Sequence, residues 1–277
     1  MQSDFMSLLK MALVWKLCRM LVVLLLGIQF IKVTRQVSIL DVHTTNESPP
    51  NEPIPFHHEM AQVPLYPKEL LFYCDLAPKT GGETPLLQSD LIFDKVKEKY
   101  PQFVDKLLEL GVIYTRIIPK DDDPSSPIGR GWVNTFGTSD PQEAQVAASK
   151  LNVKLEWLAN GDVKTVSSVL PAIKKVQIGN QEKNVWFNSL IAAYVGWTDK
   201  RNDSKKAVTF GDGTLFDSDI MEDILLMMME IRVCIPWEDG DVLWIDNNQV
   251  MHSRFILFSK LRNPFDPPRK ILAYLGK

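Results

Sequence analysis

The chain has 277 residues, of which 45% are hydrophobic, enough for a substantial buried core, and we expect one catalytic unit. Its net charge of -3 is spread over 31 basic and 34 acidic residues without a long single-sign block, which argues against nucleic-acid binding and favours a small-molecule partner. The 3 cysteines are widely spaced and form no CxxC pair, which argues against a disulfide framework or a thiolate zinc site.

An apolar segment lies near the amino terminus. Within residues 11–33, the run from Met20 to Ile31 has 12 residues, fewer than the roughly 20 that span a bilayer as a helix. It has the size of a signal-peptide core, yet no small-x-small cleavage site follows it. Residues 1–41 are therefore a targeting or anchor segment that allows membrane association, a core helix, or a stretch foreign to the domain behind it. We expect an intracellular, cytoplasmic protein, with membrane anchoring as the alternative.

Behind this segment the pattern is that of a mixed chain rich in turns. We expect strands at 69–78, 111–118, 241–246 and 270–275, and a strand followed by a loop at 184–197. Helices are expected at 89–110 with a break at Pro101, at 141–151 with Asp140 as N-cap, and at 217–232. Turn-rich loops are expected at 44–55 and 121–132. Because the strands alternate with loops rather than with regular helices, a doubly wound sheet is disfavoured. The pattern favours a mainly β fold, a sandwich or jelly roll with flanking helices.

The segment IPFHHEM holds 2 of the 4 histidines of the chain. Side chains on a strand alternate between faces, so His57 and Glu59 point together and can bind one metal ion, whereas His58 points away. A third ligand must come from His43 or His252, and His252 follows a predicted strand, which places it just beyond the strand end. Two imidazoles and one carboxylate on one side of an ion leave three positions open, as in non-haem Fe(II) oxygenases. Taken alone, the HxE pattern is a weak signal, and two polar residues on a solvated strand would be the favoured interpretation.

Four blocks occur in order along the chain: HHE, GGET, PWEDGDVLWIDNNQVMHSR and PFDPPRKILAY. Together they resemble the taurine dioxygenase-like (TauD/TfdA) group of Fe(II)- and 2-oxoglutarate-dependent oxygenases, and most of all its plant clavaminate synthase-like members. The resemblance runs from about residue 44 to residue 277. It implies a double-stranded β-helix, or jelly roll, in a catalytic domain at 42–277.

In this family the iron is held by residues that match His57, Glu59 and His252. The resemblance implies that 2-oxoglutarate chelates the iron through its 1-carboxylate and 2-oxo oxygens and that O2 takes the remaining position. Such enzymes oxidise, often by hydroxylation, a small-molecule substrate and release succinate and carbon dioxide. The metal carries the difficult chemistry, and the protein supplies position and a dry site.

The far carboxylate of 2-oxoglutarate needs a hydroxyl and a cation. Thr84 matches the family threonine that hydrogen-bonds the cosubstrate, the alternative being a turn residue. An arginine pair of the family is replaced here by Arg269 and Lys270; Lys270 corresponds by position to the binding arginine, but only one of two strand neighbours can point inward. Asn188 and Trp132 are candidates for the substrate pocket, the alternatives being a strand-end turn and core packing.

Asp246 and Asn247 are expected to cap a strand end and to orient the metal loop. Two features depart from the family: residues 255–262 look inserted, and residues 1–41 bear little likeness to the longer segment that precedes the HxE strand. A domain truncated on its amino-terminal side would expose an unpaired sheet edge. The departures favour, as an alternative function, a catalytically impaired jelly roll that binds a metal or ligand without turnover. A protein tethered through residues 11–33 and a zinc hydrolase are further alternatives, and the sequence specifies neither the substrate nor the oligomeric state.

Overall fold

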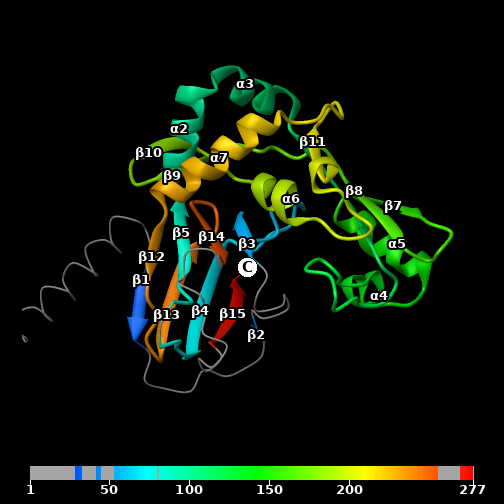
Figure 1. Cartoon of the computed structure of the whole chain (residues 1–277), viewed down its shortest axis with the longest axis horizontal. Helices are drawn as coiled ribbons and strands as arrows, with labels where there is room; N and C mark the ends of the chain where they lie inside the picture. The colour runs from blue at the N-terminus through cyan, green and yellow to red at the C-terminus, as the bar shows by residue number, and fades with distance from the viewer. Residues whose placement is uncertain (1–28, 33–41, 45–52, 80, 255–268, 277) are drawn as a thin grey trace, which may run out of the picture.

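The computed structural model describes residues 29–32, 42–44, 53–79, 81–254 and 269–276 (Figure 1). Two antiparallel sheets that face each other form the centre of the fold. The first sheet has the order β1 (Gln29–Lys32), β13 (Asp241–Asp246), β4 (Glu69–Leu76), β15 (Lys270–Gly276) and β2 (Val42–Thr44). The second has the order β12 (Val233–Ile235), β5 (Thr84–Gln88), β14 (Val250–Arg254) and β3 (Ile54–His57). Because strands from both ends of the chain alternate between the two sheets, the architecture is the expected double-stranded β-helix.

Each face of the second sheet has a different partner. Along β5 and β14, Leu86 and Val250 point into the apolar core between the two sheets, together with Phe72 of β4. Their neighbours Leu87 and Met251 point the other way, into the core beneath the helices. This alternation follows from the period of two in an extended strand. The inner face of the second sheet is therefore the face on which a site enclosed by both sheets can form.

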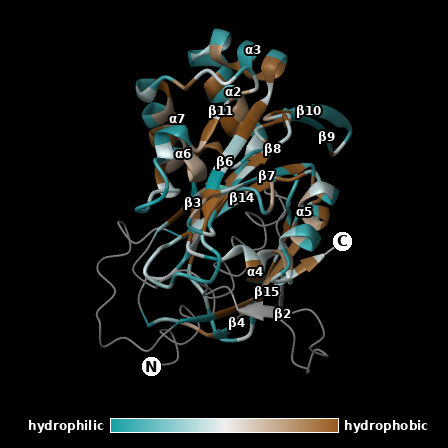
Figure 2. Cartoon of the chain, turned by 90° about the vertical axis from the view of Figure 1, so that its right-hand side faces the viewer, coloured by the Kyte–Doolittle hydropathy of each residue, from teal (hydrophilic) through white to brown (hydrophobic). Residues whose placement is uncertain are grey.

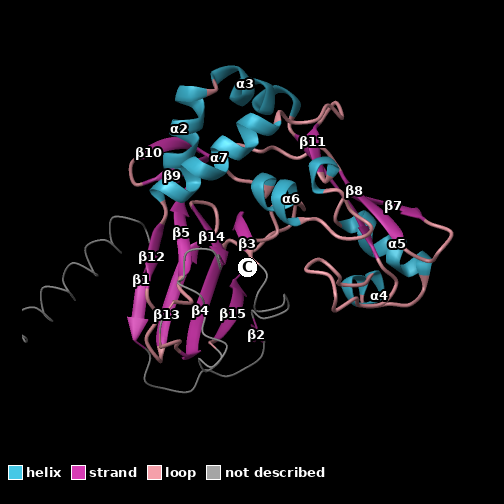
Figure 3. Ribbon diagram, in the orientation of Figure 1, coloured by secondary structure: helices cyan, strands magenta, loops and turns pink. Residues whose placement is uncertain are grey.

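The helices cover the outer face of the second sheet, as Figure 3 shows. They are α2 (Ser89–Lys99), α3 (Pro101–Leu110), α6 (Leu190–Gly196) and α7 (Ser218–Ile231). Pro101 occupies the first turn of α3, where its missing N–H costs nothing, and so separates α2 from α3. Hydrophobic residues gather where these helices meet, and hydrophilic residues lie on their outer faces (Figure 2).

A second antiparallel unit lies beside the two central sheets (Figure 1). It has the strand order β11 (Val208–Phe210), β6 (Val112–Ile118), β8 (Val163–Ser167) and β7 (Val153–Trp157). The helices α4 (Trp132–Phe136) and α5 (Pro141–Lys150) pack on it through a separate apolar cluster. The remaining elements are the hairpin β9 (Lys174–Ile178) and β10 (Gln181–Val185) and the short 3-10 helix η1 (Ser204–Lys206).

Most elements expected from the sequence are present, with two corrections. Residues 184–197 were expected to be a strand and a loop, but β10 ends at Val185 and α6 begins at Leu190. His252 was expected beyond a strand end, but it lies in the middle of β14 because pairing with both β3 and β5 extends that strand.

The amino-terminal segment is described only in part. β1 pairs with β13 over its whole length, so the segment supplies an edge strand instead of leaving β13 unpaired. The expectation of a helix or anchor for the rest of 1–41 and the suspected insertion at 255–262 lie outside the described residues. Among the described helices, none has the length and apolar character needed to cross a membrane.

Candidate metal centre

Two adjacent strands bring His57 and His252 together. β3 and β14 pair antiparallel, and His57 lies directly opposite His252 in the register. Residues opposite each other in an antiparallel pair project their side chains to the same face. The two ring centroids are accordingly 4.3 Å apart, on the face that looks toward the first sheet.

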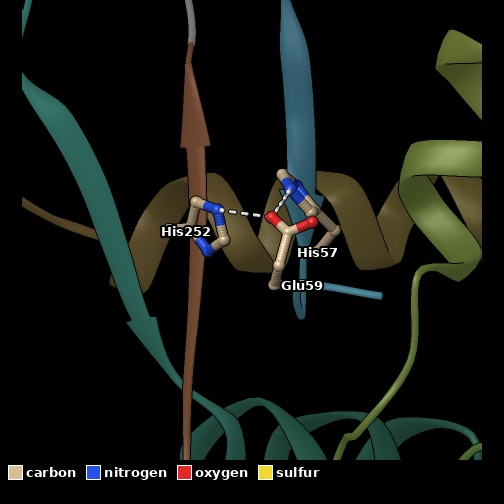
Figure 4. Close-up of side chains that lie close together, drawn as sticks. All are labelled: His57, Glu59 and His252. Atoms are coloured by element: carbon tan, nitrogen blue, oxygen red, sulfur yellow. Dashed lines mark ion pairs between the residues drawn. The ribbon is translucent and has the colours of Figure 1, made fainter. Parts of the chain in front are cut away.

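Glu59 completes the cluster from the turn that follows β3 (Figure 4). Its carboxylate oxygen Oε2 lies 3.8 Å from Nε2 of His57 and 3.7 Å from Nε2 of His252. Each residue offers one ligand atom, and these atoms all lie within 4.8 Å of one another. Two imidazole nitrogens and a carboxylate oxygen on one side of a common point form a facial set suited to a divalent transition metal.

Asn247 holds the turn that carries Glu59. The side chain of Asn247 is fully buried, and its Oδ1 accepts a hydrogen bond from the backbone N–H of Glu59 at 2.9 Å. Its Nδ2 donates to the carbonyl oxygens of Glu59 at 3.0 Å and Pro67 at 2.7 Å. Met60 then takes a left-handed conformation with φ of 56°, which reverses the chain after the carboxylate. The carboxylate position is thus fixed by backbone contacts on both sides of its own residue.

His58 faces away from the cluster. Its ring is fully buried, with Nδ1 2.5 Å from the carbonyl oxygen of Asn247 and Nε2 2.7 Å from the hydroxyl of Ser89. Burial lowers the pKa of His58 to about 3, against the opposing effect of the Asn247 carbonyl. The neutral ring therefore ties the metal turn to the loop after β13 and to the start of α2, and it has no free nitrogen for a metal.

The imidazole of His57 is oriented as a metal ligand requires. Its Nδ1 donates to the carbonyl oxygen of Pro55 at 2.8 Å, which leaves the lone pair of Nε2 toward Glu59. Metal-binding histidines commonly fix their tautomer in this way. For His252, Nε2 faces Glu59, and Nδ1 is buried without a hydrogen-bond partner among the described residues. The orphaned nitrogen fits a ring whose position is set by packing against Phe72, with ring centroids 5.3 Å apart.

The electrostatics of the three residues favour a bound cation. Burial alone would raise the pKa of Glu59, but the contact with His57 and the nearby His252 lower it below its usual value. Burial alone would lower the pKa of His57, but Glu59 and the Pro55 carbonyl raise it. Burial and the neighbouring His57 lower the pKa of His252 to about 3. A carboxylate with a lowered pKa beside two buried imidazoles therefore supplies negative charge at the place where a divalent ion would bind.

Thr84 and Arg269 lie on the same inner face. Leu86 is opposite His252 in the pairing of β5 with β14, and Thr84 is two residues before Leu86, so its side chain also points inward. The guanidinium of Arg269 donates to the hydroxyl of Thr84 at 3.0 Å, and Trp237 Nε1 lies 3.2 Å from the same oxygen. A buried hydroxyl and an arginine are thus paired two residues along β5, roughly 7 Å, from the position opposite His252.

Lys270 is not brought to this pair. Its ammonium group forms an ion pair with Asp75 at 2.7 Å, and its side chain is half exposed. The alternation of neighbours allowed only one of the two basic residues to point inward, and the structure places Arg269 there. Ile271 packs into the core between the two sheets, so Arg269, two residues earlier, shares its face, whereas Lys270, which corresponds by position to the family's binding arginine, points the other way.

The two pocket candidates are held by other contacts. The amide of Asn188 donates to the carbonyl of Ala172 at 2.9 Å, and its oxygen accepts from the N–H of Leu190 at 3.0 Å, which fits a turn that starts α6. Trp132 is buried in the cluster of α4, α5 and β7, and its indole N–H donates to the carbonyl of Gly161 at 3.0 Å. Trp237 was not singled out from the sequence, although the PWEDGD motif contains it.

The family model that matches the chain and a similar plant protein point to the same family. The model of the family "Taurine catabolism dioxygenase TauD, TfdA family" matches residues 24–162. A clavaminate synthase-like protein from Arabidopsis thaliana is 52% identical over 236 residues, which cover 85% of this chain and 68% of that protein. The dapdiamide synthesis protein DdaC from Enterobacter agglomerans is 25% identical over 87% of this chain and 70% of its own length.

Among solved structures, an asparagine oxygenase in complex with Fe(II), 3-hydroxyasparagine and succinate aligns with a TM-score of 0.44 and 11% sequence identity. The alignment covers 82% of this chain and 50% of the asparagine oxygenase, so the chain spans about half the length of that structure.

Proposed function

The chain belongs to the taurine catabolism dioxygenase TauD, TfdA family, and from this premise we propose that it is an Fe(II)- and 2-oxoglutarate-dependent oxygenase that hydroxylates or otherwise oxidises a small molecule. One observation carries the proposal. The facial set of His57, Glu59 and His252 lies on the same enclosed sheet face as the pair of Thr84 and Arg269. A metal site and an anion site at this spacing suit a small dicarboxylate that reaches both.

The three side chains fit Fe(II). They offer two neutral imidazole nitrogens and one carboxylate oxygen, the ligand set that leaves one side of the ion open. When bound, the iron together with 2-oxoglutarate and O2 supplies the oxidising power for a C–H bond, with release of succinate and carbon dioxide. Any proton on the ligand atoms of His57 and Glu59 must leave when a metal binds, since both atoms are then needed as ligands.

Arg269 and Thr84 would bind the far carboxylate of 2-oxoglutarate. The guanidinium fork suits a carboxylate, and the Thr84 hydroxyl, already held by Arg269 and close to Trp237, adds a hydrogen bond of fixed direction. The separation of roughly 7 Å along β5 is comparable with the length of the five-carbon diacid. Apolar side chains of the inter-sheet core, such as Leu86 and Phe72, exclude water from the space between the two anchors.

The proposal is tested by anaerobic addition of Fe(II) and 2-oxoglutarate to the folded protein. We expect the weak visible charge-transfer band of a chelated cosubstrate, lost in His252→Ala and shifted to higher 2-oxoglutarate concentration in Arg269→Met. Absence of the band from folded wild-type protein would refute the proposal.

Turnover separates the oxygenase from a catalytically impaired binding module. Oxygen uptake coupled to succinate release, and abolished by His252→Ala, supports the enzyme. A charge-transfer band without succinate release would instead support a jelly roll that keeps the metal and cosubstrate sites without turnover.

A further inference from the structure

The outer face of the first sheet, which points away from the second sheet, carries a group of large apolar side chains. On β4, β13 and β15 every second residue points into the core between the two sheets, as Phe72, Leu243 and Ala273 do. The residues between them point outward and, in the strand register, stand in two adjacent rows. One row is Val242, Tyr73 and Leu272, and the other is Trp244, Leu71 and Tyr274. We call these six side chains the outer block.

The described helices do not pack on the outer block. They share apolar cores with the outer face of the second sheet or with the strands β7 and β8. Tyr73 is 37% and Tyr274 is 39% exposed, and Trp244 keeps intermediate exposure. Among the described residues, these three rings have no aromatic partner and no side-chain hydrogen bond. The outer block is therefore an apolar surface without a partner in the described part of the chain.

Such a surface is unusual for a sheet with one free face. Antiparallel sheets normally carry polar side chains on the face that meets water. Here three adjacent strands are apolar on both faces, which is the composition of a middle layer. Contiguous exposed apolar patches mark places where another segment or molecule binds. The outer block thus calls for an apolar layer about three strands wide.

Residues 11–28 lead directly to this face. The next residue, Gln29, lies opposite Trp244 of the outer block, at the edge of the sheet. Within 11–28 every residue is hydrophobic except Lys16, Arg19 and Gly27. A glycine just before the strand lets the chain reverse its direction sharply. The segment can therefore turn back over the face that its own strand borders.

The dimensions of the segment agree with those of the sheet. As a helix, residues 11–26 would be about 24 Å long, and five strands at a spacing of about 4.8 Å are about 19 Å wide. A bilayer is a poorer match, because the run from Met20 to Ile31 has 12 residues and a spanning helix needs roughly 20.

The charges at the border of the face also suit this segment. Glu69 and Asp246 lie opposite each other at the end of the sheet where the chain enters β1, two residues along β13 from Trp244. Lys16 and Arg19 are the charged residues of 11–28, and both are basic. Their sign is opposite to that of the two carboxylates at this border.

We propose that residues 11–28 dock on the outer block of the same chain and form a third layer of the fold. Of the interpretations that the sequence leaves open for this segment, the inference selects a core helix and sets aside a membrane anchor. It does not depend on the metal site or on the proposed function.

Cross-linking from Cys18, which lies within the segment, tests the docking. Tyr274→Cys and Leu272→Cys are made separately to place a thiol in the outer block. Leu226→Cys is the matched control, because Leu226 is 65% exposed on α7, in the helical layer beyond the second sheet.

The other two thiols are handled as follows. All three variants carry Cys234→Ser, because Cys234 is exposed and would compete for the reagent. Cys74 is kept, because it is buried and burial raises the pKa of its thiol to about 11, which makes it slow to react.

The folded full-length variants are treated with a short bis-maleimide, digested and analysed by mass spectrometry. We expect Cys18 to be joined to the introduced cysteine within one chain at least about tenfold more often in Tyr274→Cys or Leu272→Cys than in Leu226→Cys. Equally low linkage in all three variants would overturn the inference. Linkage between two chains, seen as a covalent dimer, would also overturn it, because a second copy would then occupy the face.

An accessibility measurement gives an independent test. Leu24→Asp, Leu25→Asp and Leu26→Asp are combined, so that every side of a helical segment gains a charge. We expect a mono-maleimide to label the cysteine of Tyr274→Cys about tenfold faster when these charges are present, and that of Leu226→Cys at an unchanged rate. Equal labelling rates with and without the charges would contradict the docking.

Vesicles of phosphatidylcholine and phosphatidylserine distinguish docking from membrane binding. We expect the linkage from Cys18 to persist when they are added. If the vesicles bind the protein and abolish the linkage, the segment is a membrane anchor and the inference is wrong.

Discussion

Replacement of Asn247 by alanine tests how the candidate metal centre is held in place. The side chain makes 3 hydrogen bonds, two to the backbone of Glu59 and one to the carbonyl of Pro67, at 2.7 to 3.0 Å, and it is fully buried. At about 1 kcal/mol for each bond, Asn247→Ala should cost about 3 kcal/mol of unfolding free energy. For a chain of this size that corresponds to a fall in Tm of roughly 6 to 12 °C.

The same substitution should weaken metal binding. Without Asn247 the turn after β3 loses its contacts on both sides of Glu59, so the carboxylate samples positions away from the two imidazoles. Loss of a group that orients a ligand typically lowers metal affinity by about 10- to 100-fold. The assay is a titration with Mn(II), which is stable in air, beside thermal denaturation of the same preparations.

Asn248→Ala is the matched control for Asn247→Ala. The amide of Asn248 donates to Asp246 and its oxygen accepts from the hydroxyl of Tyr66, both at 3.1 Å and both half-buried. We expect a cost of about 1 kcal/mol or less and a metal affinity within about threefold of wild type. If the two alanine variants lose stability and metal affinity equally, Glu59 is not positioned by Asn247 and the reasoning is refuted.

Further outcomes follow from single contacts. Arg269→Met should weaken 2-oxoglutarate binding by about 10- to 150-fold, whereas Lys270→Met, which removes only an exposed ion pair, should change it less than about twofold; equal effects in anaerobic titrations would contradict the assignment. Gly82→Ala would place a Cβ 2.7 Å from the ring of Pro78 and 3.3 Å from the stem of Arg269, so it should lower both Tm and 2-oxoglutarate affinity. The control is Gly213→Ala, which also has a positive φ but no atom within 4 Å of the added Cβ, and it should lower Tm alone. Burial lowers the pKa of Lys174 from 10.5 to about 8, so below pH 8 the charged side chain lowers the stability of the folded protein. Between about pH 8 and 10.5 the native state loses this proton before the unfolded state does, and the free energy of unfolding rises with pH. Lys174→Met should flatten that rise in urea melts.

Local patterns were sufficient for much of the fold and for one part of the site. Pro101 and the cap residue Asp140 mark helix ends through backbone chemistry that acts within a few residues. The period of two placed His57 on one face and His58 on the other without knowledge of any partner strand, and the structure agrees. These predictions succeeded because each depends on bonds within the segment itself.

Features that depend on distant partners were harder to predict. The helix α6 is short, apolar and rich in aromatic and β-branched residues, so its periodicity does not distinguish it from a buried strand. The position of His252 within β14 depends on pairing with β3 and β5, whose sequences lie far away in the chain. The choice of Arg269 over Lys270 depends on which face of β15 packs against the second sheet, and it is the face of Arg269 and Ile271 that lies toward the core between the sheets.

Charge compensation was also invisible in the sequence. The run VIYTRII reads as an apolar strand for packing, and Arg116 within it attracts no notice by spacing alone. The ion pairs of Arg201 with Asp123 and Asp199, which join the loop after β6 to the loop after α6, are likewise not marked by any spacing. An ion pair depends on which residues are close in space, and the periodicity of the sequence does not reveal that.

The adjacent histidines show how one strand end serves binding and stability together. His57 turns toward Glu59 and His252, where it lies half-buried at the proposed metal site. His58 turns into the core beneath the helices, and burial keeps it neutral, with a pKa of about 3, so its hydrogen bonds to Asn247 and Ser89 persist across the physiological pH range. The ring that cannot bind the metal thus holds the loop that positions the carboxylate. Neighbouring side chains on a strand point to opposite faces of the sheet. A metal-binding side chain at position 57 therefore places residue 58 on the other face, so consecutive residues can take both roles.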